Sequence, residues 1–315
     1  MSVWVLADTA AGHANQALGV AEALNRPFEV KHIAYTKLAV LPNRMLGATL
    51  AGIAKETRAQ LAPPWPDLVI AAGRRTAPLA RWIKRQSKGA TRIVQIMHPG
   101  AGASDFDLIA LPLHDSHAAA PNQLRIVGAP HRLTRDKLAA AREEWETKLA
   151  HLPRPYLAVL VGGATHKRPF DAKTAALLAD QIEALRHRLG GSLLVTGSRR
   201  TPAPAWEALA ARLKEPCALF DGHGTENPYL AFLAMGDEIL VTGDSVSMLS
   251  EACFTGNPVH LFAPTGFVGA KHARLHADLI AKGYALKPGA DRVSFASPLP
   301  LDAASDIADA IRKLI

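Results

Sequence analysis

The stretch Leu68-Val69-Ile70-Ala71-Ala72 contains only apolar residues and is followed by Gly73-Arg74-Arg75. A strand with one face in water alternates polar and apolar residues, whereas an unbroken apolar run is typical of a parallel strand covered on both faces. Residues 77–87, which come next, have apolar positions at helical spacing. A strand followed by a helix is the unit of layered α/β folds, so this stretch predicts a buried parallel sheet.

The same alternation continues in both directions along the chain. Before residue 150, further strands are expected at 3–7, 28–33, 92–97, 107–111 and 124–127, with a helix at 14–24. After it, strands are expected at 156–161, 192–196, 238–241 and 258–262, and helices at 172–189 and from Ser245 to about Phe254. We therefore expect an α/β protein of two doubly wound domains in tandem.

A charged helical stretch, 139–151, is broken by Leu152-Pro153-Arg154-Pro155, and these prolines predict a domain boundary. We place the two domains at residues 1–150 and 151–315. The stretch 303–315 has the pattern of an amphipathic helix, and whether it packs back on the first domain is left open.

The composition excludes several classes of protein. With 315 residues, 49% of them hydrophobic and 20% charged, the chain is typical of a packed globular protein. Its two cysteines, Cys217 and Cys253, exclude a disulfide framework and a zinc knuckle. The run after Met1 lacks the basic start of a signal peptide, and no stretch approaches the ~18 apolar residues that span a bilayer. We expect a cytoplasmic protein, with peripheral attachment to the inner face of the membrane as a further option.

The positive charge is concentrated in the first half. Residues 1–150 hold 19 Lys and Arg against 12 Asp and Glu, whereas residues 151–315 hold 17 against 16. This asymmetry favours an anionic partner for the first half, either a nucleic acid, an anionic membrane surface or an acidic substrate. No nucleic-acid-binding module is recognisable, which makes nucleic acid the weakest of the three. A basic helix face in solvent would explain the charge equally well.

Two basic segments with apolar residues are candidates for a membrane-binding surface. Helix 77–87 carries Leu79, Trp82 and Ile83 on one stripe, with arginines and lysines beside it. The second segment, 37–58, carries Leu41, Met45, Leu46, Leu50 and Ile53 between Lys37, Arg44, Lys55 and Arg58. In the competing interpretation the stripe of helix 77–87 packs on the sheet and only its basic face meets solvent.

The turn after the first strand, Ala7–Gln16, is rich in small residues and contains Asp8 and His13. In open α/β sheets, ligands bind beyond the carboxyl ends of the strands, where loops meet helix N-termini. A histidine in that place suits proton transfer at neutral pH, and Asp8 is the alternative base. A hydrogen-bonded helix cap would explain His13 without catalysis.

Two turns in the second half have residue types that bind phosphate. Gly162-Gly163 follows a strand and lets backbone N–H groups approach an anion, and Thr165 adds a hydroxyl. The turn Thr196–Thr201 (TGSRRT) places two guanidinium groups at a strand end, where their forked shape suits a diphosphate. Neither turn has the Walker or G-x-G-x-x-G spacing, and a surface arginine pair is the plain alternative.

The turn Thr242–Glu251 is the most informative. Gly243 and the hydroxyls of Ser245 and Ser247 stand where a helix begins, and N–H groups and the helix dipole favour an anion there. Ser247 and Glu251 are four residues apart and share a helix face, so a phosphate at the first and ribose hydroxyls at the second would explain both. A capped helix with an exposed acid would explain Ser245 but not the whole set.

Three motifs together carry a resemblance to known proteins. They are Gly12–Leu24 (GHANQALGVAEAL), Thr196–Thr201 (TGSRRT) and Gly243–Ala252 (GDSVSMLSEA). Over most of its length the chain resembles the mitochondrial-fission, or elongated-mitochondria, protein family. Through Ala10–Leu24, Glu238–Ala252 and Lys271–Ala285 it is more distantly similar to the N-acetylglucosaminyltransferase that completes lipid II, although Ala10-Ala11 stand where that enzyme has glycines.

The resemblance implies a GT-B-like fold, in which two Rossmann-like domains face a central cleft. It implies an inverting, metal-independent glycosyltransferase that needs no cofactor and uses a nucleotide-diphosphate sugar as its substrate. The second domain would hold the donor and the first the acceptor, for which a lipid-linked molecule is one candidate. Arginine and helix-terminus N–H groups would neutralise the leaving diphosphate. Inversion is only the default that the resemblance supplies, so the choice between inverting and retaining stays open, as do base, sugar and acceptor.

The resemblance also assigns residues to roles. His13, or else Asp8, would be the catalytic base. The acceptor-side residues would be Gly12, Asn15, Gln16 and His98. The donor-binding residues would be Gly162, Gly163, Thr165, Ser198, Arg199, Arg200, Thr201, Gly243, Asp244, Ser245, Ser247, Met248 and Glu251.

Two other functions fit the same resemblance. A nucleotide-sugar epimerase shares the fold, and plant members of the family are associated with organelle division, which suits a non-enzymatic protein that recruits a membrane or a partner. A recruiting protein has no need for Gly162-Gly163, Arg199-Arg200 and Glu251 together, and this favours the transferase. Asp105-Phe106-Asp107 has the D-x-D spacing of metal-dependent glycosyltransferases, but its place before a strand predicts a turn and a strand start.

Overall fold

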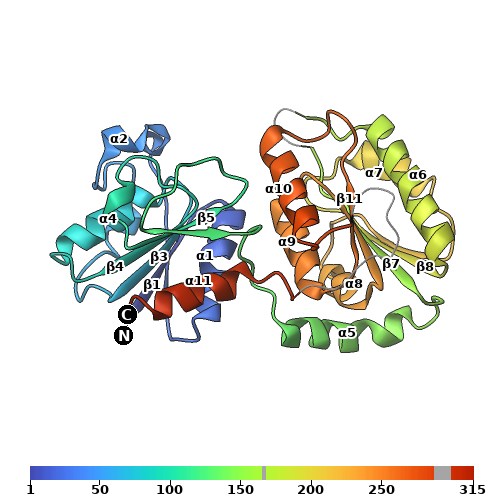
Figure 1. Cartoon of the computed structure of the whole chain (residues 1–315), viewed down its shortest axis with the longest axis horizontal. Coiled ribbons are helices and arrows are strands. Elements are labelled where there is room, and N and C mark those ends of the chain that lie inside the picture. The colour runs from blue at the N-terminus through green and yellow to red at the C-terminus, as the bar shows by residue number, and fades with distance from the viewer. Residues whose placement is uncertain (165–167, 287–298) are drawn as a thin grey trace. The chain divides into compact units, whose positions relative to one another are not determined.

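The structure is a computed structural model that describes residues 1–164, 168–286 and 299–315. These residues form two compact units, each an α/β layer structure (Figure 1). The first unit comprises Met1–Arg132 and Asp302–Ile315, and the second comprises Leu133–Leu301. Thr165, one of the predicted phosphate-binding residues, lies outside the described residues.

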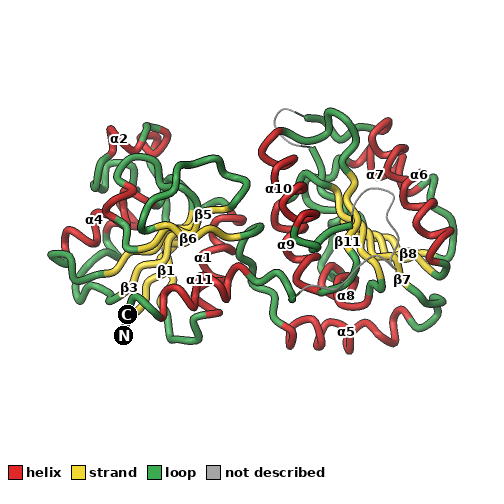
Figure 2. The backbone as a smooth tube through the Cα atoms, viewed as in Figure 1, coloured by secondary structure: helices red, strands yellow, loops and turns green. Residues whose placement is uncertain are grey.

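The first unit is built on a six-stranded parallel sheet in the order β2-β1-β3-β4-β5-β6 (Figure 2). The strands are β1 (Val3–Ala7), β2 (Glu29–His32), β3 (Leu68–Ala72), β4 (Arg92–Ile96), β5 (Leu108–Pro112) and β6 (Gln123–Ile126). Every residue of β3 is buried, as its unbroken apolar run predicts. The chain passes from β1 to β2 on one side and then to β3 on the other, which puts the topological switch point between β1 and β3.

Helices cover both faces of this sheet. On one face, α1 (Ala11–Ala23) and α11 (Ala303–Arg312) form an apolar cluster with Val5 of β1. On the other face, α4 (Ala77–Gln86) forms a second apolar cluster with Leu6 of β1. The two layers arise because successive residues of a strand point to opposite faces.

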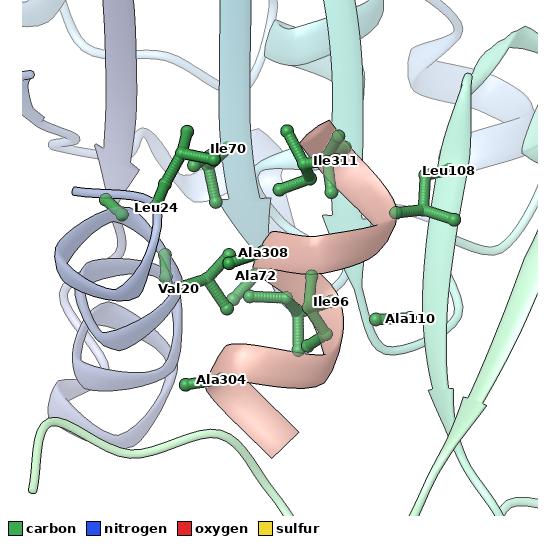
Figure 3. Packing of buried hydrophobic residues seen from close by; sticks show 14 of the residues in the cluster. Val20, Leu24, Ile70, Ala72, Ile96, Leu108, Ala110, Ala304, Ala308 and Ile311 are labelled. Atoms are coloured by element: carbon green, nitrogen blue, oxygen red, sulfur yellow. The ribbon is translucent and has the colours of Figure 1, made fainter. Parts of the chain in front are cut away.

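Helix α11 follows the second unit in sequence and completes the core of the first (Figure 3). Ile311 is fully buried in the same apolar cluster as Ile70 and Ile96. Arg312 donates a hydrogen bond to the carbonyl oxygen of Ala23, at 2.7 Å, which ties the helix to α1. The terminal helix therefore belongs to the first unit.

The structure excludes most of the residues that we considered for a membrane-binding surface. Leu79 and Ile83 on α4 are fully buried over the sheet, and Trp82 packs edge-on against Trp65 with ring centroids 5.6 Å apart. The apolar stripe of α4 thus covers the sheet, as in the competing interpretation. In segment 37–58, Leu46 and Ile53 are buried, Leu41 and Leu50 are half-buried, and Met45 is exposed. Among the residues described, no helix is both long and apolar enough to cross a membrane.

The second unit has a five-stranded parallel sheet in the order β11-β10-β7-β8-β9. The strands are β7 (Tyr156–Leu160), β8 (Ser192–Thr196), β9 (Cys217–Phe220), β10 (Glu238–Thr242) and β11 (Val259–Phe262). The helices are α5 (Arg135–Leu149), α6 (Ala172–Leu189), α7 (Ala203–Ala210), α8 (Tyr229–Met235), α9 (Val246–Thr255) and α10 (Ala270–Ala281). Here the switch point lies between β7 and β10, because β8 and β9 extend the sheet on one side of β7 and β10 and β11 on the other.

Helix α5 belongs to the second unit, so the chain leaves the first unit at Arg132 and not near residue 150. Arg142 on α5 donates a hydrogen bond to the carbonyl oxygen of Ala234 on α8. Trp145 packs edge-on against Phe232, with ring centroids 6.3 Å apart. These contacts hold α5 against α8, and the proline-rich break at 152–155 falls inside the second unit.

Candidate functional site

Asp8 follows β1 directly and lies at the switch point of the first sheet. Its side chain is fully buried, and its oxygens accept hydrogen bonds from Ala10 N–H (3.0 Å), His13 Nδ1–H (3.1 Å) and Arg75 Nη2 (2.6 Å). Burial raises the pKa of Asp8, but the hydrogen bonds from His13 and Ala10 and the charge of Arg75 outweigh it and lower the pKa to about 2. The carboxyl group is therefore an anion at neutral pH.

The ionised Asp8 fixes the orientation of His13. A carboxylate only accepts hydrogen bonds, so the neutral imidazole carries its proton on Nδ1 and keeps a lone pair on Nε2. The side chain of His13 is 35% exposed. Gly73, with φ at +81°, leaves room for the ring, because a Cβ at Gly73 would lie 2.4 Å from His13 Nδ1. The two residues that the sequence offered as alternative bases thus form one carboxylate–histidine pair, an arrangement that suits a general base.

Two further members of this cluster, Arg75 and Tyr35, were missed at the sequence level. Arg75 follows β3, across the switch point from Asp8, and its guanidinium lies over the Tyr35 ring at 4.6 Å from the centroid. Burial raises the pKa of Tyr35 well above its usual range, and the charge of Asp8 adds to this. The position of Arg75 in the turn after a buried parallel strand was the signal that could have identified it, because Asp8 lies in the corresponding turn after β1.

Replacing Asp8 by asparagine is expected to lower the free energy of unfolding by about 2 kcal/mol at neutral pH. The pKa of Asp8 is about 2 in the folded protein, against 3.8 for an unperturbed aspartate, so the ionised carboxyl group contributes its full stabilisation at pH values above 3.8. That contribution is lost as the pH falls through about 2, because below that pH the carboxyl group is protonated in both states. Urea unfolding of both proteins at pH 7 and pH 3 measures the difference. A difference independent of pH would contradict the electrostatic origin.

The predicted acceptor-side residues fall into two places. Gly12, Asn15 and Gln16 lie in the first turns of α1 with His13. His98 follows β4, and its ring stacks on His117 with centroids 4.1 Å apart and an interplanar angle of 7°. Burial and the neighbouring His117 lower the pKa of His98. The structure thus groups three of the four residues with the Asp8–His13 pair and places His98 two strands away at the same sheet edge.

The D-x-D stretch is a turn and a strand start, as its position predicts. Asp105 ends the short 3-10 helix η2 (Ala103–Asp105) and pairs with Arg81 at 2.7 Å. Asp107 precedes β5 and pairs with Lys84 (2.7 Å) and Arg92 (2.9 Å). Both carboxylates are neutralised by side chains of the first unit.

At the switch point of the second sheet, the glycine turn after β7 meets the turn after β10. The Gly162 N–H group donates to Thr242 Oγ1 (2.7 Å), and the Gly163 N–H group donates to Asp244 Oδ2 (3.1 Å). The Thr242 hydroxyl donates to Asp244 Oδ1 (2.7 Å). A Cβ at Gly162 would lie 2.3 Å from this carboxylate. Asp244 therefore fills the space in which we expected a phosphate, and both glycine N–H groups are already used within the protein.

Arg200 binds the same carboxylate from the turn after β8. Its Nη2 lies 2.9 Å from Asp244 Oδ2, and its side chain is 44% exposed. The turn is tied to β7 because the Ser198 hydroxyl donates to the carbonyl oxygen of Gly162 (2.8 Å) and the Thr201 hydroxyl donates to the same oxygen. Ser198 and Thr201 thus position the turn, and Arg200 is the residue that faces the switch point. Its neighbour Arg199 is exposed.

The first turn of α9 carries the remaining predicted donor residues. Ser245 caps the helix by accepting a hydrogen bond from the Met248 N–H group (3.4 Å), and Ser247 lies half-buried in the same turn. Glu251, one turn later, accepts a hydrogen bond from the Tyr229 hydroxyl on α8. Burial raises the pKa of Glu251 to about 7, against the opposing effect of that hydrogen bond. Glu251 is thus half-buried and not the exposed acid of the alternative interpretation, and carboxyl groups with a pKa shifted in this way are common at functional sites.

Two histidines of α10 complete the second cluster and were not predicted. His276 Nε2–H donates to the carbonyl oxygen of Gly243 (2.9 Å), and a Cβ at Gly243 would lie 2.4 Å from the ring. Burial lowers the pKa of both His272 and His276, and the charge of Asp244 acts against this in each case. Both imidazoles are therefore neutral at pH 7, and they close the cluster around Asp244 without adding charge.

Comparison with known proteins assigns the chain to a family. The model of the mitochondrial fission ELM1 proteins matches residues 11–315. The chain belongs to the mitochondrial fission ELM1 family. The match includes the three motifs at Gly12–Leu24, Thr196–Thr201 and Gly243–Ala252, which confirms the resemblance they carry.

Relatives of this ELM1 family member occur in a bacterium and in a plant. An uncharacterized protein of Rickettsia prowazekii is 30% identical in an alignment 307 residues long, and the match covers 86% of each chain. The mitochondrial fission protein ELM1 of Arabidopsis thaliana is 31% identical in an alignment 253 residues long, and the match covers 73% of this chain and 58% of that one.

Solved structures show the fold of this ELM1 family member. MurG of Acinetobacter baumannii matches with a TM-score of 0.54 and 15% identity, over 99% of this chain and 100% of that one. The UDP-GlcNAc 2-epimerase of Neisseria meningitidis, solved bound to UDP-GlcNAc, matches with a TM-score of 0.53 and 13% identity, over 99% and 100% of the two chains. The fold is that of GT-B glycosyltransferases and epimerases, as expected from the motifs.

Proposed function

We propose that this chain is a glycosyltransferase that moves a sugar from a nucleotide-diphosphate sugar to an acceptor hydroxyl without a metal ion. One observation carries the proposal. In each unit, polar side chains from distant parts of the sequence converge at the switch point of a parallel sheet, where such folds bind ligands. The fold shared with MurG and with an epimerase solved with UDP-GlcNAc supports a nucleotide sugar as the donor.

In the first unit, His13 is the proposed base. Its Nε2 takes the proton of the acceptor hydroxyl while the hydroxyl oxygen bonds to the anomeric carbon of the sugar. The bond from that carbon to the diphosphate oxygen breaks, and the nucleoside diphosphate leaves. Asp8 holds the imidazole through Nδ1–H and stabilises the positive charge that develops on it. Gly12, Asn15 and Gln16, beside His13 on α1, are proposed to bind the acceptor.

In the second unit, the first turn of α9 and Arg200 are the proposed diphosphate site. The N–H groups of Gly162 and Gly163 donate to Thr242 and Asp244, so we place the anion at the N–H groups and hydroxyls in the first turn of α9. Arg200 would neutralise the leaving phosphate, a role that metal-dependent enzymes give to a cation. Glu251 is proposed to accept hydrogen bonds from the ribose.

An Arg200→Ala variant is expected to bind the nucleoside diphosphate at least about tenfold more weakly than the wild type, because a charge-assisted hydrogen bond to phosphate is lost. A thermal-shift screen of UDP, ADP, GDP and dTDP sugars identifies the donor, since a ligand at 100 times its Kd stabilises by about 2.7 kcal/mol. Isothermal titration then compares the variants. Arg212→Ala is the matched control, because Arg212 is 49% exposed and pairs with Asp180. Unchanged affinity in both Arg200→Ala and Glu251→Ala would remove this assignment.

The same preparation separates the proposal from its alternatives. An epimerase alters the sugar of UDP-GlcNAc with no acceptor present, whereas a transferase releases the nucleoside diphosphate in proportion to added acceptor. A protein that recruits a membrane or partner without catalysis would bind none of the nucleotides in the screen.

A further inference from the structure

Three exposed apolar side chains lie close together in the sequence of the first unit. Leu38, Val40 and Met45 are 49%, 77% and 66% exposed; we call them the apolar tip. They belong to the short helices η1 (Lys37–Val40) and α2 (Asn43–Leu46), and α2 projects beyond the sheet (Figure 1). Single exposed apolar residues are ordinary on proteins, whereas a group of them marks a contact surface.

Arg74 and Asn43 hold the tip in a fixed shape. The Arg74 guanidinium donates to the carbonyl oxygens of Leu41 (2.6 Å) and Ala39 (3.1 Å). The Asn43 side chain is buried, and its Nδ2 donates to the carbonyl oxygens of Arg74 (2.8 Å) and Pro99 (2.5 Å). The exposure of the tip is therefore a property of the folded chain.

Most backbone carbonyl groups of the tip accept hydrogen bonds from other groups of the protein. The carbonyl oxygen of Leu38 accepts a hydrogen bond from Leu41 N–H (3.0 Å), and that of Pro42 accepts one from Met45 N–H (2.9 Å). With the two carbonyl groups that Arg74 binds, few peptide oxygens remain to be desolvated. Unpaired carbonyl groups are costly in an apolar layer, so this backbone suits contact with lipid.

The charges around the tip have one sign. Between Glu29 and Glu56 the sequence has no acidic residue, and it has lysine or arginine at positions 31, 37, 44 and 55. Lys37 and Arg44 are exposed and flank the tip on its own segment. Cations beside an apolar group complement an anionic lipid surface, where they meet the phosphate groups.

We propose that residues 37–46 dock this protein on an anionic phospholipid surface. Leu38, Val40 and Met45 enter the boundary between headgroups and acyl chains, while Lys37 and Arg44 lie at the phosphates. Arg74, which braces the tip, precedes Arg75, which binds Asp8, so adjacent residues connect the tip to the candidate site of the first unit. The docking does not rest on the proposed transferase activity.

Vesicle flotation of the full chain, without nucleotide, tests the proposal. The wild type is expected to float with vesicles of phosphatidylcholine and phosphatidylglycerol at low salt, and not with phosphatidylcholine alone. The triple variant Leu38→Ser, Val40→Ser, Met45→Ser is expected to lower the partition coefficient by about 100-fold, because three half-exposed apolar side chains are lost. The matched control is Leu177→Ser, Leu219→Ser, whose side chains are 47% and 41% exposed in the second unit. That control is expected to float like the wild type.

A second variant tests the cations. Lys37→Glu, Arg44→Glu is expected to weaken flotation by at least about tenfold. All substituted side chains are exposed, and thermal unfolding by circular dichroism checks that each variant is folded. Flotation of the triple variant equal to the wild type would overturn the proposal, as would equal flotation with neutral vesicles. The proposal would also be overturned if the wild type did not float with anionic vesicles at low salt. The tip would then be assigned to contact with another protein.

Discussion

A His13→Ala variant is expected to transfer sugar about 10²–10⁴-fold more slowly than the wild type while it binds the nucleotide sugar with unchanged affinity. An aligned general base contributes a factor of this size, and the proposed donor contacts come from other residues in the second unit. The rate is measured as nucleoside diphosphate released from the donor that the thermal-shift screen identifies, with a membrane lipid extract as the source of acceptor. Titration calorimetry of the same donor measures affinity.

Gly73→Ala tests whether the position of the His13 imidazole matters, because it displaces the ring and leaves the histidine in the chain. The new Cβ would lie 2.4 Å from His13 Nδ1, so the ring must leave its place beside Asp8, and a comparable loss of rate is expected. His32→Ala removes an exposed histidine of the same unit and serves as the control. A normal rate for His13→Ala together with an inactive Asp8→Asn would assign the proton transfer to Asp8.

A Gly163→Ala variant is expected to lower the free energy of unfolding of the second unit by about 3 kcal/mol. Its Cβ would lie 2.0 Å from the carbonyl oxygen of Arg200 and 2.7 Å from the Thr201 nitrogen, both of which are backbone atoms. The turn cannot move away cheaply, because Ser198 and Thr201 bind the carbonyl oxygen of Gly162. Urea unfolding followed by circular dichroism measures the change.

Gly269→Ala is the matched control for this substitution. Gly269 lies in the same unit with an ordinary φ of −86°, and a Cβ there would meet no atom within 4 Å. Gly269 is the N-cap of α10, where glycine is preferred to alanine, so the substitution is expected to cost at most about 1 kcal/mol. If Gly163→Ala proves as stable as Gly269→Ala, the prediction is wrong, and the turn after β8 can move away from the added Cβ despite its hydrogen bonds.

The parallel strands could be predicted from the sequence, but the order in which they pair could not. An unbroken apolar run such as Leu68–Ala72 indicates a strand buried on both faces, whatever its neighbours are. Asp8 and Arg75 are 67 positions apart, and they meet only because β1 pairs directly with β3. The sequence therefore indicated Asp8 and His13, which are close in the chain, and missed Arg75 and Tyr35.

The structure differs from the sequence-based predictions at two other places, because sequence patterns do not show which elements are in contact. Helical spacing shows that α4 has an apolar face, but it does not say whether a sheet or a lipid layer covers Leu79. In the second unit the sequence shows glycine N–H groups in one turn and an acid, Asp244, in another. Only the pairing of β7 with β10 shows that they satisfy each other. The apolar tip has no periodic pattern, so Leu38 and Val40 became visible only through their exposure in the fold.

Because of helix α11, the core of the first unit can be completed only at the end of translation. This helix is translated after the whole second unit, yet it packs with Ile70 and Ile96 in the core of the first. Domains of a growing chain usually fold as they emerge from the ribosome, but in this first unit the sheet face that α1 and α11 share is only partly covered until residues 303–312 are made. Closure of its core therefore requires that the second unit has been translated, and a chain that stops before residue 303 leaves the part of the sheet beside α1 open to chaperones and proteases.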